Sequence, residues 1–242
     1  MSLKLNKKIN SLISQNLIIK GIIYVNIIFF ALSLLISGKK INITLNPFAM
    51  LSPSIESIIL LGGSGTVPIN HYHQWWSLIS ANWLHGSILH ILFNMTALLQ
   101  IAPLIAREYG GGRMFIIYTI SGISGFLLSY FAGVKLTIGA SGAICGLIGS
   151  ALYYGKSRGG VFGKAVFKQT STWIFCLIVF GLIIPNINNW GHGGGLVSGM
   201  FLGWLLGYNE KKKEQIVHKF FSIFCIIGSF MILIWAIASV FA

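Results

Sequence analysis

The sequence predicts an all-α polytopic membrane protein. Of its 242 residues, 55% are hydrophobic and only 9% are charged, whereas soluble domains average roughly 25% charged residues. Several uncharged apolar runs reach the roughly 20 residues that a helix needs to cross the hydrocarbon core of a bilayer. A water-soluble core cannot bury this much apolar surface, so we expect membrane-spanning helices to set the architecture.

Seven apolar runs qualify as membrane helices. The first run follows a basic start and ends without the small-residue pattern of a signal-peptide cleavage site, so we expect it to be retained. The predicted spans are Ile18–Ile36, His85–Ala106, Arg113–Ala132, Ile138–Tyr154, Thr170–Ile184, Trp190–Tyr208 and Lys219–Phe241. The long connection, residues 39–84, contains apolar stretches and three tryptophans, which favours a place partly in the membrane interface.

The basic residues predict the orientation of these spans. With the N-terminus in the cytoplasm, the outer segments hold only Lys39, Lys40 and Lys135 of the 17 basic residues. The inner segments hold the other 14, which are Lys4, Lys7, Lys8, Lys20, Arg107, Arg113, Lys156, Arg158, Lys164, Lys168, Lys211, Lys212, Lys213 and Lys219. The positive-inside rule therefore predicts a cytoplasmic N-terminus, and the odd number of spans places the C-terminus outside. We expect the bacterial cytoplasmic membrane as the location.

We interpret the basic residues behind the net charge of +13 as signals of membrane orientation. Their short, dispersed patches do not form the continuous basic surface that nucleic-acid binding requires, so we expect no nucleic-acid partner. The chain divides into a basic cytoplasmic segment at residues 1–17, a six-helix membrane core at residues 18–208, and a basic loop with the seventh span at residues 209–242.

Four polar side chains are candidates for a functional site, because polar groups at membrane depth are costly and are kept for a reason. His90 and Asn94 lie four residues apart, on one face of the second predicted helix. Ser141 lies near the outer start of the fourth helix and His192 near that of the sixth. These three helices all run from outside inward, so the four residues share the outer half of the bilayer.

Glycines predict which helices touch. They recur every four residues through the sixth helix, at positions 191, 195, 199, 203 and 207, and they line the fourth at 142, 146 and 149. Small residues at this spacing let membrane helices approach closely. We expect Gly142 and Gly146 to pack against Gly195 and Gly199, which would bring the serine of one helix to the histidine of the other.

The missing residue types narrow the chemistry. The chain contains no aspartate, and its four glutamates lie in loops or at predicted helix ends. This composition excludes a Ser-His-Asp triad, an intramembrane aspartyl dyad and a His-Glu-x-x-His zinc site. The three cysteines have no metal-ligand spacing, so we expect neither a metal nor a cofactor. What remains is a serine activated by a histidine with no carboxylate behind it.

At these residues the sequence resembles the rhomboid family of intramembrane serine proteases. The matching motifs are Gly139-Ala140-Ser141-Gly142 for Gly-x-Ser-Gly, His90-Ile-Leu-Phe-Asn94 for His-x-x-x-Asn, and Gly191-His192-Gly193-Gly194-Gly195 followed by Gly199 for the histidine helix. The resemblance covers about Trp75 to Tyr208. It implies a rhomboid-like six-helix core, to which this chain adds a seventh C-terminal transmembrane helix.

The resemblance also implies a site and a reaction. Ser141 would be the nucleophile and His192 the general base, which then protonates the leaving amine as an acid. His90, Asn94 and the Ser141 backbone N–H would stabilise the oxyanion. The substrates would be transmembrane proteins in the lipid bilayer, cleaved near the outer leaflet.

Three features depart from the family pattern. The chain reads Trp75-Trp76-Ser77 where many members have Trp-Arg, and Cys145 stands where an aromatic residue often packs on the catalytic histidine. The stretch Arg107–Arg113 matches the family's charged, glycine-containing turn only loosely. None of these departures removes the serine or the histidine. Two other functions stay open: a catalytically silent relative that binds membrane helices, and a transporter, which the histidine and asparagine at membrane depth would serve.

Overall fold

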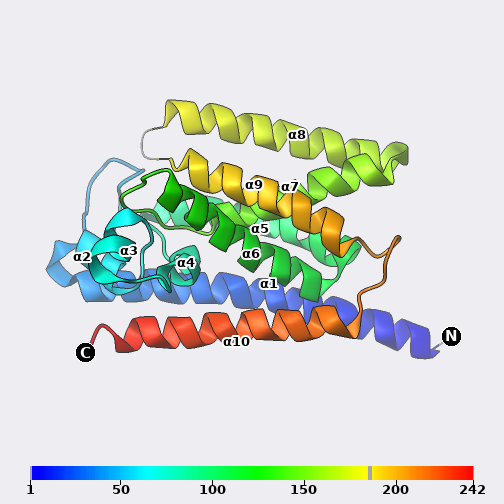
Figure 1. The fold of residues 1–242 in the computed structure, drawn as a ribbon, viewed down its shortest axis with the longest axis horizontal. Coiled ribbons are helices and arrows are strands. Elements are labelled where there is room, and N and C mark those ends of the chain that lie inside the picture. Colours follow the sequence, from blue (N-terminus) through cyan, green and yellow to red (C-terminus); the bar gives the residue numbers. More distant parts are fainter. Residues whose placement is uncertain (1, 185–186, 242) are drawn as a thin grey trace.

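The chain is all-helical, as predicted. The computed structural model describes residues 2–184 and 187–241, with side chains from residue 16 onward. In this described part, seven helices of 18 or more residues occupy the seven segments expected to span a membrane and lie alongside one another as a bundle (Figure 1). They are α1 (Ser2–Ser37), α5 (Ile88–Tyr109), α6 (Gly111–Phe131), α7 (Ser141–Arg158), α8 (Gly160–Ile183), α9 (Asn189–Leu206) and α10 (Ile216–Ala238).

The long connection between α1 and α5 is a folded lobe at one end of the bundle (Figure 1). Its short helices are η1 (Gly38–Lys40), α2 (Ile55–Leu60), α3 (Thr66–Tyr72), α4 (Ser77–Ser80) and η2 (Ala81–Trp83). Ser64 and Thr137 exchange two backbone hydrogen bonds, and the N–H of Gly139 donates to the carbonyl of Ala81 at 2.9 Å. The lobe, residues 38–87, therefore holds the segment that leads into α7.

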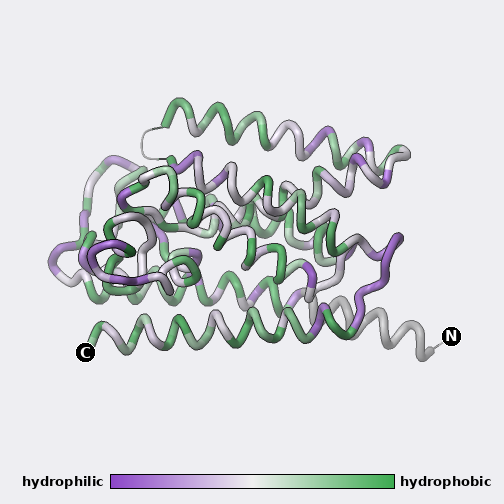
Figure 2. The backbone as a smooth tube through the Cα atoms, in the orientation of Figure 1, coloured by the Kyte–Doolittle hydropathy of each residue, from purple (hydrophilic) through white to green (hydrophobic). Residues whose placement is uncertain are grey.

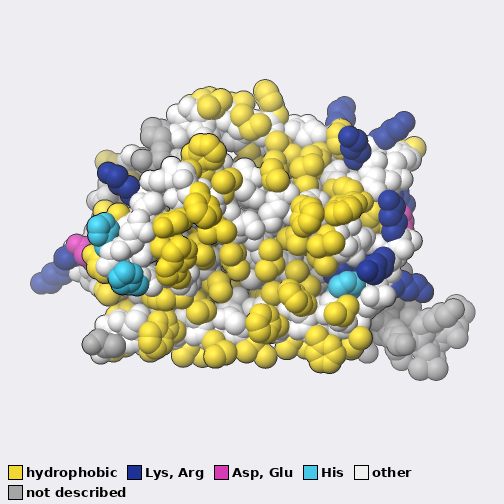
Figure 3. Space-filling view, viewed as in Figure 1, with side chains coloured by type: hydrophobic (Ala, Val, Ile, Leu, Met, Phe, Trp, Pro, Cys, Tyr) yellow, Lys and Arg dark blue, Asp and Glu magenta, His cyan; other side chains and the backbone are white. Residues whose placement is uncertain are grey.

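The long helices make the chain an integral membrane protein. Five segments are long and apolar enough to cross a membrane, namely Asn16–Lys40, Ile88–Tyr109, Gly111–Phe131, Gly160–Ile183 and Ile216–Ala238. Hydrophilic residues gather toward the two ends of the bundle (Figure 2). Apolar side chains cover the middle of the face in Figure 3, and lysines and arginines gather mainly at the end opposite the lobe, here called the basic end.

Helices α7 and α9 are not among these five segments. Glycine and serine take the place of large apolar side chains in both helices, α9 also contains His192, and α7 ends with Lys156 and Arg158, so the hydropathy of both is lower. Most of α7 is buried inside the protein, so its composition reflects packing against other helices more than contact with lipid.

Several helix boundaries differ from the predicted ones. Helix α8 begins at Gly160, ten residues before the predicted Thr170, because Gly159 and Gly160 have positive φ and end α7 there. Helix α7 begins at Ser141 instead of Ile138, because the preceding residues are hydrogen-bonded to the lobe. Helix α1 begins at Ser2, so residues 2–17 of the predicted N-terminal segment continue into the first span without a break.

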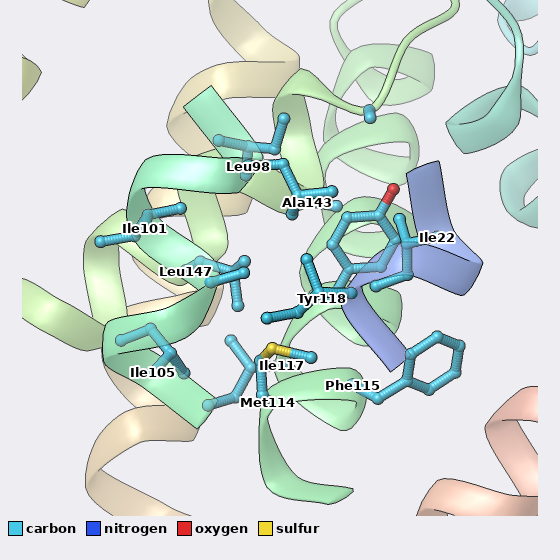
Figure 4. Close-up of a cluster of buried hydrophobic side chains, with 14 of the residues drawn as sticks. Ile22, Leu98, Ile101, Ile105, Met114, Phe115, Ile117, Tyr118, Ala143 and Leu147 are labelled. Atoms are coloured by element: carbon cyan, nitrogen blue, oxygen red, sulfur yellow. The ribbon is translucent and has the colours of Figure 1, made fainter. Parts of the chain in front are cut away.

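The core lies where α5, α6 and α7 meet, with α1 closing one side. Figure 4 shows its side chains, among them Leu98, Ile101 and Ile105 from α5, Met114 and Ile117 from α6, Leu147 from α7 and Ile22 from α1. All of these are nearly or fully buried. Helix α7 is thus surrounded on several sides and forms the centre of the bundle.

Glycines bring the α7 and α9 backbones into direct contact. A Cβ at Gly195 would overlap the carbonyl oxygen of Gly142, and a Cβ at Gly199 would overlap that of Gly146. A Cβ at Gly149 would likewise meet the backbone of α9. The obstructing atoms belong to main chains, so neither helix can move aside by a change of rotamer.

An arginine ties the basic end together. Arg113 is 0% exposed, and its guanidinium donates to the carbonyls of Leu206, Gly207 and Lys212, which lie at and beyond the end of α9. Its backbone N–H donates to the carboxylate of Glu214 at 3.1 Å. The last carbonyls of α9, which have no partners within the helix, are therefore held by the first turn of α6.

We predict that Gly199→Ala destabilises the protein. The added methyl group would collide with the Gly146 carbonyl, and overpacking of this kind costs about 1–3 kcal/mol or more. Thermal unfolding in detergent should show the loss as a lower transition temperature. Gly193→Ala is the matched control on the same helix, because a Cβ there meets nothing within 4 Å. Equal transition temperatures for the two variants would contradict the close α7–α9 contact.

Candidate active site

The structure brings Ser141 and His192 together. Ser141 is the first residue of α7, and His192 lies in the first turn of α9. The Oγ of Ser141 and the Nε2 of His192 are 2.9 Å apart, a hydrogen-bonding distance. Both side chains are half-buried. A polar contact between groups 51 residues apart in sequence thus forms at the lobe end of the bundle.

The backbone before His192 fits into a gap between two other helices. A Cβ at Gly142 would lie 3.3 Å from the carbonyl oxygen of Gly191, and a Cβ at Gly125 on α6 would lie 2.6 Å from it. Glycines on α6 and α7 therefore admit the turn that carries His192. The same small residues that pack the helices set the distance between the serine and the histidine.

Gly139 shapes the approach to Ser141. Its φ of +123° lies in a region that side-chain-bearing residues rarely adopt. A Cβ at this position would also lie 2.8 Å from the Cε1 and Nε2 atoms of His90. Gly139 therefore allows both the turn into α7 and the close approach of the His90 ring to that turn.

The His90 ring faces the turn that precedes Ser141. Its Nδ1 accepts the backbone N–H of Gly86 at 3.2 Å, so in the neutral ring Nε2 carries the proton and is a donor. The backbone N–H of His90 in turn donates to the Oγ of Ser87, the N-cap of α5. The local fold thus aims an N–H donor toward the neighbourhood of Ser141.

Asn94 lies one turn farther along α5 and is 6% exposed. Its side-chain N–H donates to the carbonyl of His90 at 2.8 Å. In this conformation the amide bonds to its own helix, and the structure does not bring it into hydrogen-bond contact with Ser141 or His192.

The second ring nitrogen of His192 has no protein partner. Its Nδ1 is buried and accepts or donates no hydrogen bond among the described residues. The described residues also contain no group of three histidine, cysteine or acidic side chains that could hold a metal. The groups in contact here are one hydroxyl and one imidazole, with an N–H donor from α5 nearby.

Two further side chains lie near the site. His85 is 0% exposed, and its ring meets the His90 ring edge-on with 5.0 Å between centroids. Asn188 is the N-cap of α9, and its side chain accepts the backbone N–H of Gly191. Asparagine is a preferred N-cap, so an asparagine four residues before His192 indicates that the helix carrying the histidine begins there. Cys145, by contrast, is a buried free thiol.

The fold and this geometry define a class: an integral membrane protein of helices that holds a serine–histidine pair at the start of two of them. Comparison with protein-family models narrows the class further. The rhomboid domain model matches residues 72–209, more than half of the chain. The chain therefore belongs to the rhomboid family.

Curated relatives carry the same family name. RHOMBOID-like protein 4 of Arabidopsis thaliana is 34% identical over 159 residues, which is 65% of this chain and 40% of the relative. The rhomboid protease GluP of Bacillus subtilis is 37% identical over 156 residues, 64% of this chain and 31% of the relative. The putative rhomboid protease YdcA of the same species is 33% identical over 144 residues, 59% and 71% respectively. The chain thus spans less than half the length of the first two.

Proposed function

We propose that this protein is an intramembrane serine endopeptidase that cleaves transmembrane segments of other proteins near the outer leaflet. The observation that carries the proposal is the 2.9 Å contact between Ser141 Oγ and His192 Nε2. Its setting in a rhomboid domain, with relatives that are named rhomboid proteases, supports the reaction class. A serine hydroxyl becomes a nucleophile when an adjacent base accepts its proton.

In the proposed reaction, Ser141 Oγ attacks a substrate carbonyl carbon while His192 Nε2 takes the hydroxyl proton. The C–O bond forms, the carbonyl oxygen becomes an oxyanion, and the protonated imidazole then gives the proton to the leaving amine as the C–N bond breaks. Water, activated by the same imidazole, then cleaves the acyl-enzyme and regenerates the serine. No carboxylate takes part, in keeping with the unpartnered Nδ1 of His192.

The oxyanion would form at the start of α7. The first backbone N–H groups of a helix have no acceptor within it, so the N–H of Ser141 is a natural donor. The Nε2–H of His90 would be a second donor, given its tautomer. Asn94 would be a third once its amide turns away from the His90 carbonyl. In this role each donor acts mainly in the transition state.

We further propose that all seven long helices cross the bilayer, with the N-terminus in the cytoplasm and the C-terminus outside. Helix α7 is mostly buried by its neighbours, and α9 exposes large apolar side chains such as Val197 and Phe201, so the lower hydropathy of both is compatible with crossing. The basic end would then face the cytoplasm and the lobe the outer side, as the positive-inside rule favours. The bacterial cytoplasmic membrane is the proposed location.

We predict that Ser141→Ala and His192→Ala each reduce proteolysis to background. The purified protein in proteoliposomes should cleave a single-span substrate, and a fluorophosphonate probe should label Ser141. Ser157→Ala is the matched control, because Ser157 lies at the basic end, where its hydroxyl accepts from Lys211. Cleavage that persists in Ser141→Ala would refute the proposed nucleophile. Substrate binding without labelling or cleavage would instead indicate a silent binder.

We predict a smaller, kcat-specific loss for His90→Ala. Removal of one oxyanion donor typically lowers kcat by about 10²–10³-fold, and KM should change little because the donor acts in the transition state. Steady-state kinetics on a fluorogenic transmembrane peptide would measure both. An unchanged kcat would exclude His90 from the oxyanion site, whereas solute flux that is lost in His90→Ala, without proteolysis, would favour a transporter.

We predict opposite reporter activities at the two termini. Alkaline phosphatase is active only outside the cytoplasm, so a fusion after Ala242 should be active and a fusion before Met1 inactive. Green fluorescent protein, which folds in the cytoplasm, should show the reverse pattern. The same reporter result at both termini would mean an even number of crossings and would contradict the proposed seven spans.

A further inference from the structure

Asn188 caps the helix that carries His192. It is the last residue before α9 and is half-buried. Its backbone carbonyl accepts the N–H of His192 at 3.1 Å, and its side-chain oxygen accepts the N–H of Gly191 at 3.0 Å. The turn that presents the imidazole is therefore bonded twice to one residue.

The other half of the same amide reaches two different elements. Its Nδ2 donates to the hydroxyl of Thr137 at 2.8 Å and to the hydroxyl of Ser129 at 2.7 Å. Thr137 lies four residues before Ser141 in the segment that leads into α7, and Ser129 lies near the end of α6. Asn188 thus uses one oxygen and two N–H groups to join α6, α9 and the serine-bearing segment.

This junction is closely packed. Ser129 is fully buried and its own hydroxyl donates to the Gly125 carbonyl. Thr137 is held on its backbone by the paired bonds with Ser64. A Cβ at Gly191 would lie 2.9 Å from the Nδ2 of Asn188. The partners of the amide are therefore themselves fixed, so the hydrogen bonds define a position instead of following a mobile loop.

The glycine contacts alone do not prevent α7 and α9 from sliding along their axes. Backbone packing of α7 against α9 limits how far apart the helices lie, but small smooth surfaces allow sliding along the helix axes. Hydrogen bonds are directional and weaken steeply when bent. A polar link between the start of α9 and the segment before α7 therefore fixes the axial register at the level of the serine and the histidine.

We propose that Asn188 is a positioning residue for the Ser141–His192 pair: its amide couples the cap of the histidine helix to Thr137 and Ser129. This inference rests on the proposed protease function. Misplacement of reacting groups by about 1 Å can cost roughly 10²-fold in rate, so loss of the coupling should lower kcat and spare substrate binding. Asn188 itself touches neither substrate nor reacting atoms.

Three substitutions separate coupling from capping. Asn188→Ser keeps a good N-cap but is too short to reach Thr137 and Ser129. Thr137→Val removes one acceptor without touching the cap and keeps the side-chain shape. Thr137→Ser restores the hydroxyl and is the conservative rescue. Asn189→Ser is the matched neighbour control, because the exposed Asn189 amide donates to the Gly181 carbonyl, away from the pair.

Kinetics, fluorophosphonate labelling rates and thermal unfolding of the 242-residue chain in proteoliposomes would test the inference. We expect Asn188→Ser and Thr137→Val each to lower kcat and the labelling rate about 10- to 100-fold, with KM and the unfolding temperature little changed. Thr137→Ser and Asn189→Ser should resemble the wild type. The double variant Asn188→Ser/Thr137→Val should lose no more than Asn188→Ser alone, since the Asn188–Thr137 hydrogen bond is already absent there.

The outcomes distinguish this inference from the function on which it rests. If Ser141→Ala abolishes cleavage but Thr137→Val keeps the wild-type kcat, the coupling role is wrong and the protease function stands. If Asn188→Ser and Thr137→Val both keep the wild-type kcat per folded protein, Asn188 is a cap alone and the coupling role is wrong. A wild type that neither cleaves nor is labelled would overturn both.

Discussion

The contact between α7 and α9 is the constraint on which the rest of the structure depends. Membrane helices gain no hydrophobic stabilisation from each other in lipid, so they associate through close packing and polar contacts. Here the carbonyl oxygens of Gly142 and Gly146 lie where Cβ atoms of Gly195 and Gly199 would be. No larger residue fits at either position on α9, so the interhelical distance and the meeting of Ser141 with His192 have the same cause.

The polar groups of the site all lie at helix N-termini. Ser141 is the first residue of α7, His192 lies in the first turn of α9, and His90 lies in the first turn of α5. The N-terminal end of a helix carries a partial positive charge and free N–H groups. Three such ends close together favour the negative charge that an oxyanion develops. In the proposed reaction this arrangement would stabilise the oxyanion, whereas a buried carboxylate would oppose it.

The sequence predicted the helix contact and the site because the residue types involved have one dominant structural role in a membrane helix. Glycine at four-residue spacing indicated the α7–α9 contact, and polar groups at membrane depth indicated the site. The folded lobe was not predictable, because its bonds join Ser64 and Ala81 to residues far along the chain. Arg113 counted only as an orientation signal, since composition cannot distinguish an exposed cation from one buried against carbonyls some 100 residues away.

Polar bonds between α6 and α9 complement the glycines. At the basic end, Arg113 of α6 binds the last carbonyls of α9. Midway, the hydroxyl of Ser198 donates to that of Ser124 at 3.1 Å, and at the lobe end the Asn188 amide binds Ser129. These directional contacts along one helix pair oppose axial sliding, whereas the glycines of α7 limit separation. The two kinds of contact restrain different motions: polar bonds to α6 and to Thr137 fix His192 along the helix axis, and the glycines of α7 fix it across the axis.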